Sequence, residues 1–269
     1  MFMANKHGFF NNISCLVFDI DGVLIKGENA IRGAPEAFNT IAKRIKVFAL
    51  TNNSTRSRKH VAEKLKSLGF EISSEQVITS AFLAAEYCRK KKHKKYFYIG
   101  EEGIRTELDS AGLTLDPDNP SCVVVGLDRH ITYSKLATAT KAILNGAEFV
   151  ATNTDKLLPL EKGFSPGGGA IVASVSCATG KKPVVVGKPK TLGLKIIAEL
   201  LSLKKNQLAV VGDRYYTDIK MAKSFGCKSI LVLTGIKNEP DPGKGKYQAD
   251  MVIKNLKEIA RVFSNIPKK

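Results

Sequence analysis

The stretch Cys15-Leu16-Val17-Phe18-Asp19-Ile20-Asp21-Gly22-Val23-Leu24 organises the chain, because it joins an apolar run to two carboxylates and a turn. An unbroken apolar run of this length predicts a strand buried on both faces, as in a parallel sheet. Ligands of open α/β sheets bind beyond the carboxyl ends of such strands, which is where Asp19 and Asp21 stand. Two carboxylates this close repel each other unless a cation lies between them or one holds a proton. Taken alone, the pair also fits a helix-capping Asp followed by a turn Asp.

Other apolar runs also end in polar residues. These residues are Thr51, Asn52 and Asn53 after the run 46–50, Lys188 after the run 184–186, and Asp213 after the run 208–211, with Asp218 five positions later. A doubly wound sheet gathers the carboxyl ends of its strands along one edge, so we expect one site that holds a divalent cation and a phosphate together. Each signal has a plainer alternative, namely a helix-capping loop for the Thr51 segment, an exposed turn lysine, and a capping Asp.

The order of strand and helix patterns predicts an α/β fold with a doubly wound, parallel-sheet (Rossmann-like) core. The core pattern runs through residues 1–82 and resumes at 183–269, and a second series of strands and helices fills residues 83–182. Lys188 lies 137 positions after Thr51, which is far more than one crossover connection needs. We therefore expect residues 83–182 to form a smaller α/β cap domain inserted into the core.

The segment Phe18 to Leu24 resembles the first motif of the haloacid dehalogenase-like phosphohydrolases, and the strand-end residues resemble the four motifs of that superfamily in their order. Within the predicted insertion, three segments resemble the α/β (class IIA) cap of the 4-nitrophenylphosphatase-like branch. They are Val125-Gly126-Leu127-Asp128, Ala151-Thr152-Asn153-Thr154-Asp155 and Pro166-Gly167-Gly168-Gly169-Ala170. The resemblance covers nearly all of the chain beyond residue 13.

The resemblance implies that Asp19 is the nucleophile and that Asp21 is the general acid and base. The chemistry of the other residues assigns them to the metal, to the phosphate or to a supporting role. Asp19, Asp21 and Asp213 are the expected Mg²⁺ ligands, Thr51, Asn52, Asn53 and Lys188 the expected phosphate contacts, and Asp218 the residue that orients Lys188 or a water. The resemblance also implies that His130 touches the leaving group, although it also fits a plain surface histidine.

We expect an Mg²⁺-dependent phosphatase that hydrolyses a small organic phosphate monoester through an aspartyl-phosphate intermediate. Phosphoglycolate, glycerol phosphate and 4-nitrophenyl phosphate are candidate substrates, with a nucleotide or a sugar phosphate as the alternative. Carbon–halogen hydrolysis on the same fold is disfavoured, because it has no use for Asp21, Asp213 and the metal that they imply.

The amino-acid composition limits the class of protein and the binding partners that we expect. The chain has 269 residues, 43% hydrophobic and 25% charged, with no apolar run as long as a membrane span and no pattern typical of a signal peptide. Five scattered cysteines without a C-x-x-C pair indicate a reducing compartment, so we expect a cytoplasmic protein. A basic protein that binds nucleic acid is the non-enzymatic alternative.

The net charge of +17 suits an anionic partner. The dense basic run Arg89-Lys90-Lys91-Lys92-His93-Lys94-Lys95 contains no aromatic residues to stack on bases, which favours a solvated linker over a nucleic-acid surface. The expected partner is a small phosphorylated metabolite, without nucleic acid or membrane, and the resemblance allows a homodimer through the cap.

Overall fold

The computed structural model describes residues 8–159, 163–235 and 247–264. The chain divides into two compact units, each with a parallel sheet of its own. The first unit comprises residues 1–51, 62–77 and 188–269, and the second comprises residues 52–61 and 78–187. The sequence placed the boundaries of the insertion at residues 83 and 182. The observed second unit extends further at both ends and also includes the loop after Thr51.

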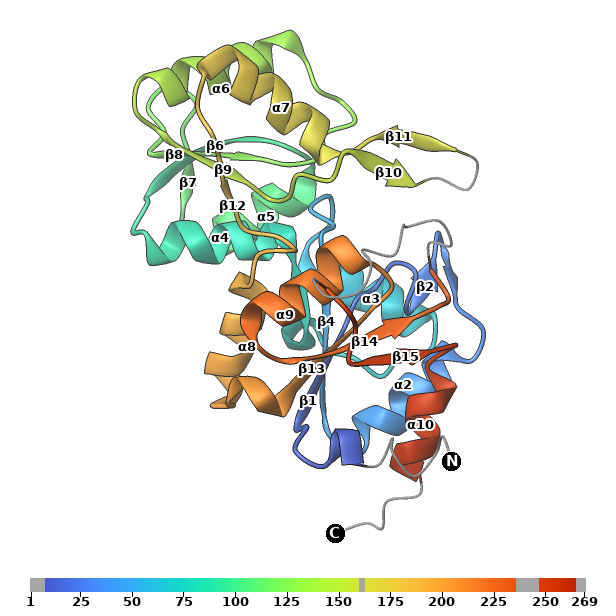
Figure 1. Ribbon diagram of the computed structural model, residues 1–269. Coiled ribbons are helices and arrows are strands. Elements are labelled where there is room, and N and C mark those ends of the chain that lie inside the picture. Colours follow the sequence, from blue (N-terminus) through green and yellow to red (C-terminus); the bar gives the residue numbers. More distant parts are fainter. Residues whose placement is uncertain (1–7, 160–162, 236–246, 265–269) are drawn as a thin grey trace. The chain divides into compact units, whose positions relative to one another are not determined.

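The sheet of the first unit has six strands in the order β15-β14-β13-β1-β4-β5 (Figure 1). They are β1 (Cys15–Phe18), β4 (Lys46–Thr51), β5 (Val77–Thr79), β13 (Leu208–Gly212), β14 (Lys228–Val232) and β15 (Met251–Ile253). β1 pairs in parallel with β4 on one side and with β13 on the other, and β14 and β15 continue in parallel beyond β13. The strand order therefore reverses between β1 and β13, which is where open α/β sheets bind their ligands.

The central strands form where the apolar runs predicted them. All residues of β1 and β13 are buried, and in β4 only Lys46 is exposed. The helices of this part are α2 (Ala34–Ala42), α8 (Leu192–Leu201), α9 (Lys220–Phe225) and α10 (Lys257–Ser264), together with α3 (Arg58–Ser67) from residue 62 onward. Because strands buried on both faces need helices above and below, this arrangement confirms the predicted doubly wound core.

The second unit has a five-stranded sheet in the order β12-β9-β8-β6-β7, and all of its pairings are parallel. The strands are β6 (Lys95–Ile99), β7 (Thr114–Leu115), β8 (Cys122–Val125), β9 (Glu148–Ala151) and β12 (Val184–Val185), and the helices are α4 (Ser80–Lys90), α5 (Glu102–Ser110), α6 (Tyr133–Leu144) and α7 (Gly168–Thr179). Apolar side chains of β6, β8 and β9 pack with those of α6 and α7 into one core. Figure 1 shows α6 and α7 together on one face of this sheet.

Several short elements were absent from the sequence prediction. They are the hairpin of β2 (Ile25–Lys26) and β3 (Asn29–Ala30), the hairpin of β10 (Leu157–Pro159) and β11 (Phe164–Pro166), strand β7, the 3₁₀ turns Ser74–Gln76 and Lys205–Gln207, and the π-helical turn Tyr215–Ile219. Elements of two to five residues are too short to show a period of 2 or 3.6 in the sequence.

Three predictions about the surface and the core can be compared with the described residues. No helix among them is both long and apolar enough to cross a membrane. All five cysteines are free thiols, and four are buried, with Cys177 exposed. The basic run is exposed except for His93, whose Nε2 lies 2.6 Å from Oε2 of Glu148.

Candidate active site

A buried lysine lies between two buried carboxylates in the first unit. Lys188 Nζ is 2.6 Å from Asp19 Oδ1 and 2.7 Å from Asp218 Oδ1. Asp19 follows the last residue of β1, and its backbone N–H donates to the carbonyl of Val211 in β13, so the nearby backbone is held on that side. The side chains of Lys188 and Asp218 are 4% and 0% exposed, so water hardly screens these two contacts.

Asp213 completes a cluster of three carboxylates. One oxygen each of Asp19, Asp213 and Asp218 lies within 4.8 Å of the other two, and all three residues are buried. Carboxylate oxygens are the ligands that Mg²⁺ and Ca²⁺ prefer, so this donor set fits a hard divalent cation. With Lys188 the cluster carries a formal charge of −2, which a divalent cation would neutralise.

The cluster shifts the proton affinities of its members. Burial raises the pKa of Asp19 well above its usual range, the neighbouring carboxylates of Asp218 and Asp213 add to the rise, and Lys188 opposes it. Burial by itself would lower the pKa of Lys188, but Asp19 and Asp218 outweigh burial and raise it. Lys188 is therefore a permanent cation, and any further positive charge would favour the ionised form of Asp19.

The carboxylate of Asp218 has contacts that explain its position. Its Oδ2 accepts hydrogen bonds from Thr217 Oγ1 at 3.2 Å and from the Arg214 backbone N–H at 3.3 Å, while Oδ1 accepts from Lys188. Both carboxylate oxygens are thus engaged by the protein, Oδ2 by the π-helical turn and the residue before it, and Oδ1 by the distant Lys188. Asp19 and Asp213 are the members of the cluster better placed to contact an ion directly.

The backbone near Asp213 is shaped by glycine. Gly22 has a φ of +81°, which favours glycine, and a Cβ there would collide with the Asp213 carboxylate. A Cβ at Gly235 would collide with the same carboxylate. The Gly22 carbonyl, in the turn after Asp21, accepts a hydrogen bond at 2.7 Å from Oγ1 of Thr234, the residue before Gly235. Two backbone segments therefore approach Asp213 more closely than any larger residue would allow.

Asp21 and Thr51 complete the part of the predicted site that lies in the first unit. Thr51 is the buried last residue of β4, the strand next to β1. The Asp21 side chain reaches solvent, but surrounding protein atoms are dense enough to raise the pKa of its carboxyl, with Lys188 opposing the rise. A carboxyl with a raised pKa can hold a proton closer to neutral pH than an ordinary Asp.

Asn52 and Asn53 belong to the second unit. Asn52 Nδ2 donates to Asp155 Oδ2 at 3.0 Å, and the Asn52 carbonyl accepts from Asn153 Nδ2 at 2.8 Å. Asn53 Oδ1 accepts from the Thr55 backbone N–H at 2.9 Å and from the Thr55 hydroxyl at 3.1 Å. The loop thus has the local capping contacts of the plainer sequence interpretation, together with contacts to residues far along the chain.

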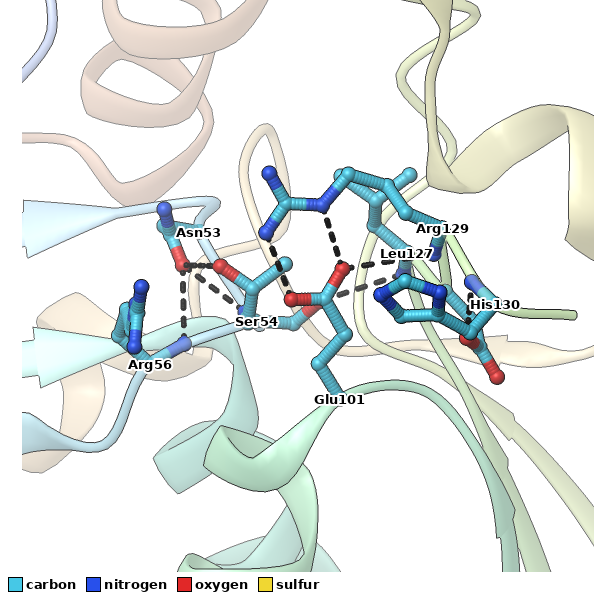
Figure 2. A network of polar contacts seen from close by, with 9 residues as sticks. Asn53, Ser54, Arg56, Glu101, Leu127, Arg129 and His130 are labelled. Carbon is cyan, nitrogen blue, oxygen red and sulfur yellow. Dashed lines mark hydrogen bonds and ion pairs between the residues drawn. The ribbon is translucent and has the colours of Figure 1, made fainter.

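His130 is exposed on a loop of the second unit that ion pairs hold in place. Asp128 Oδ1 accepts from the His130 backbone N–H at 2.8 Å, and its other oxygen accepts from Lys135 Nζ at 2.7 Å. Arg129 makes a two-pronged contact with Glu101, with Nε and one terminal nitrogen each 2.7 Å from a carboxylate oxygen (Figure 2). These contacts join the loop around His130 to Glu101 and to Lys135 in α6.

Sequence reasoning did not assign roles to Asn153 and Asp155, although they follow strand β9 directly. The rule that polar residues matter at the carboxyl ends of parallel strands applies to them as it does to Asp19. That signal was present in the sequence, but their partner Asn52 was not identifiable, because 103 positions separate Asn52 from Asp155.

Comparison with known proteins identifies the family. The profile of the haloacid dehalogenase-like hydrolases matches residues 16–114, and a second, HAD-hydrolase-like profile matches residues 185–259. An acid sugar phosphatase from Staphylococcus haemolyticus is 40% identical over 228 residues, which cover 84% of this chain and 87% of that protein. The chain belongs to the haloacid dehalogenase-like hydrolases.

Solved structures place this hydrolase within the family. A p-nitrophenyl phosphatase from Archaeoglobus fulgidus matches with a TM-score of 0.87 and 33% identity, over 93% of this chain and 98% of that one. A glycerol phosphate phosphatase from Mycobacterium tuberculosis, solved in complex with magnesium, matches with a TM-score of 0.83 and 32% identity, over 96% of this chain and 78% of that one. The predicted resemblance to the 4-nitrophenylphosphatase-like branch is confirmed.

Proposed function

We propose that this hydrolase is an Mg²⁺-dependent phosphatase that cleaves a small organic phosphate monoester through a phosphorylated Asp19. The observation that carries the proposal is the buried cluster of Asp19, Lys188, Asp213 and Asp218 beside the point where the strand order of the first sheet reverses. The names of the related phosphatases support the reaction type.

Asp19 is the nucleophile in this proposal. Its carboxylate attacks phosphorus, the ester oxygen leaves, and water then hydrolyses the aspartyl phosphate, which divides one difficult displacement into two easier ones. Lys188, 2.6 Å from Asp19 Oδ1, favours the ionised form of the attacking carboxylate and reduces its repulsion of the phosphate.

Asp21 is the general acid and base. Its raised pKa suits donation of a proton to the leaving oxygen and then removal of a proton from the attacking water. Because both roles belong to one group, replacing Asp21 should slow the formation and the hydrolysis of the phosphoenzyme together.

Asp19 and Asp213 would hold the Mg²⁺, together with the backbone carbonyl of Asp21. When bound, the ion supplies positive charge for the phosphate and for the charge that develops during transfer. Asp218 holds Lys188 in position, as its 2.7 Å contact and complete burial indicate.

Thr51, Asn52 and Asn53 donate hydrogen bonds to the phosphate oxygens in the proposed complex, and His130 contacts the leaving group. A small phosphorylated metabolite is the proposed substrate, with phosphoglycolate, glycerol phosphate and 4-nitrophenyl phosphate as first candidates. Sugar phosphates and nucleotides are the alternative, and the sugar phosphatase relative supports the former. We also propose a cytoplasmic location and a homodimer through the cap.

The experiment compares wild type with Asp19→Asn and, as a matched control, Asp118→Asn, which changes an exposed carboxyl in the second unit. We expect Asp19→Asn to lose turnover of 4-nitrophenyl phosphate and the mass increase of a trapped phosphoenzyme, with an unchanged circular dichroism spectrum. The control should keep both. Chelation of Mg²⁺ should abolish wild-type turnover reversibly. Substantial turnover by Asp19→Asn would refute the assignment of the nucleophile.

A further inference from the structure

The turn that follows β9 is bound to the loop that follows β4. The Asn52 carbonyl accepts from Asn153 Nδ2 at 2.8 Å and from Ser80 Oγ at 2.7 Å, and Asn52 Nδ2 donates to Asp155 Oδ2 at 3.0 Å. Side-chain and backbone atoms of Asn52 are therefore held at the same time, by residues whose positions in the sequence are distant. Such a set of bonds restricts both the place of the residue and the rotation of its amide.

The turn after β9 also has a hydrogen bond between two of its own residues. Asn153 is 5% exposed, and its Oδ1 accepts from the Asp155 backbone N–H at 3.0 Å. The Asn153 amide thus uses its oxygen for its own turn and its nitrogen for Asn52. Because each end of the amide has a partner of the right polarity, a change of either end disturbs one contact and leaves the shape of the side chain nearly unchanged.

The same turn contacts the residue before Lys188. The Gly187 backbone N–H donates to the Thr152 carbonyl at 2.8 Å. A Cβ at Gly187 would collide with that carbonyl and would lie 2.6 Å from Asn52 Oδ1. Glycine at this position therefore allows the Asn52 amide to pack directly against the backbone.

We propose that Asn153 and Asp155 are positioning residues for the reaction, which act by fixing the Asn52 amide that binds the phosphate. The proposal rests on the proposed function for the role of Asn52. Asp155 accepts a hydrogen from Asn52 Nδ2 and so determines which edge of the amide presents nitrogen. Asn153 holds the backbone of the same residue. A purely structural turn would stabilise the second unit without any effect that passes through Asn52.

Isosteric variants and one truncation separate these possibilities. Asp155→Asn keeps an oxygen that can accept from Asn52 Nδ2, whereas Asp155→Ala removes it. Asn153→Asp keeps the acceptor for the Asp155 backbone N–H but turns a carboxylate oxygen toward the Asn52 carbonyl. We expect Asp155→Ala and Asn153→Asp to lower kcat/KM by about tenfold or more, the usual scale for a hydrogen bond that positions a reacting group, and Asp155→Asn to retain most activity.

Asp116→Ala is the matched control. Asp116 is also half-buried in the second unit, its Oδ1 accepts from two turn backbone N–H groups, and its Oδ2 lies 2.8 Å from Lys95 Nζ. Its loss should cost comparable stability but leave kcat and KM within about twofold of wild type. Asp155→Ala should change kcat and KM at full Mg²⁺ saturation, with thermal unfolding midpoints close to those of the control.

The decisive measurement is a double-variant cycle with Asn52→Ala. If Asp155 acts through Asn52, the variant Asn52→Ala/Asp155→Ala should have the same kcat/KM as Asn52→Ala alone, within about twofold. Additive losses, or an Asp155→Ala enzyme no worse than the Asp116→Ala control, would overturn the proposal.

Binding of inorganic phosphate, measured by calorimetry with Mg²⁺ present, separates this proposal from the proposed function. Weaker binding by Asp155→Ala than by Asp116→Ala supports the positioning role even if wild type turns over no ester, in which case only the proposed reaction fails. Equal binding by these two variants, or no binding by wild type, overturns the positioning role.

Discussion

Replacing Asp213 with Asn should stabilise the protein without metal and destabilise it, relative to wild type, with metal. In the absence of a cation, Asp213 lies among like charges, since its carboxylate has an oxygen within 4.8 Å of one oxygen each of Asp19 and Asp218. Asn has almost the same size and shape as Asp but carries no charge. The substitution therefore removes repulsion while it preserves packing against Gly22 and Gly235.

The spacing of the oxygens sets the scale of the effect. At 4.8 Å and an effective dielectric constant of about 20, two unit charges repel each other by about 3.5 kcal/mol. Asp213 has two such neighbours, but attraction to Lys188 and partial protonation of the cluster offset much of the sum. We expect a net gain of about 1–3 kcal/mol for Asp213→Asn in chelator, which corresponds to an increase in Tm of several degrees.

Added Mg²⁺ should reverse the order of stability, so that wild type becomes more stable than Asp213→Asn. A ligand at about 100 times its Kd stabilises the folded state by about 2.7 kcal/mol, and wild type should gain on this scale when Mg²⁺ is added. Asp213→Asn lacks one carboxylate ligand and should gain much less. Thermal unfolding by circular dichroism, in chelator and then in millimolar Mg²⁺, measures both differences, with Asp118→Asn as a control that should follow wild type in both conditions.

Two results would refute this reasoning. A lower Tm for Asp213→Asn than for wild type in chelator would mean that the carboxylate is net stabilising among its neighbours. An Mg²⁺-induced increase in Tm equal to that of wild type would mean that Asp213 is not a ligand.

Other predictions concern pH and backbone space. Arg129 lowers the pKa of Glu101, so the stabilisation of the fold by this ion pair is complete above about pH 4.5 and is lost as the pH falls through the lowered pKa. Glu101→Gln should therefore cost about 0.5–1 kcal/mol near neutral pH and nothing in strong acid. Burial raises the pKa of Glu107, so ionisation of this carboxyl lowers the free energy of unfolding as the pH rises from about 4.5 to the raised pKa. Over that interval Glu107→Gln should become more stable relative to wild type. Urea titrations at several pH values measure both effects, and the same pH dependence for the two variants would contradict the opposite signs. Gly235→Ala should reduce the Mg²⁺-induced increase in Tm and lower kcat/KM by about tenfold or more, because its Cβ collides with Asp213; normal Mg²⁺ dependence would contradict the close packing.

The core of the fold could be predicted because its information is local. The run before Asp19 and the run before Asp213 are apolar over their whole length, and a strand buried on both faces has no other pattern. The order of strands and helices then restricts the topology to a few choices. The hairpin β2–β3 and the turn around Asp218 escaped prediction, because elements this short show no period and depend on the contacts around them.

The candidate site likewise has features that the sequence predicted and features that it did not. That Asp19 and Asp213 would converge followed from their place after β1 and β13, which pair in parallel in one sheet. The same argument does not hold for Lys188, because β12, the strand before it, belongs to the sheet of the second unit. That Lys188 lies between Asp19 and Asp218 did not follow, because a side chain takes its partner from whatever the folded backbone places within a few ångströms.

The amino-acid sequence by itself determined which of the central strands are buried and which acids and cations follow the apolar runs, and it predicted an insertion whose bounds differ from those of the observed second unit. Tertiary structure alone decided the pairing of Asn52 with Asp155 and the grouping of the loop after Thr51 with the second unit. Burial and strand order depend on the average polarity of short segments, which a sequence displays directly. A hydrogen bond between residues 103 positions apart requires the donor and acceptor to be placed to within a few tenths of an ångström, and only the packed chain fixes positions that closely.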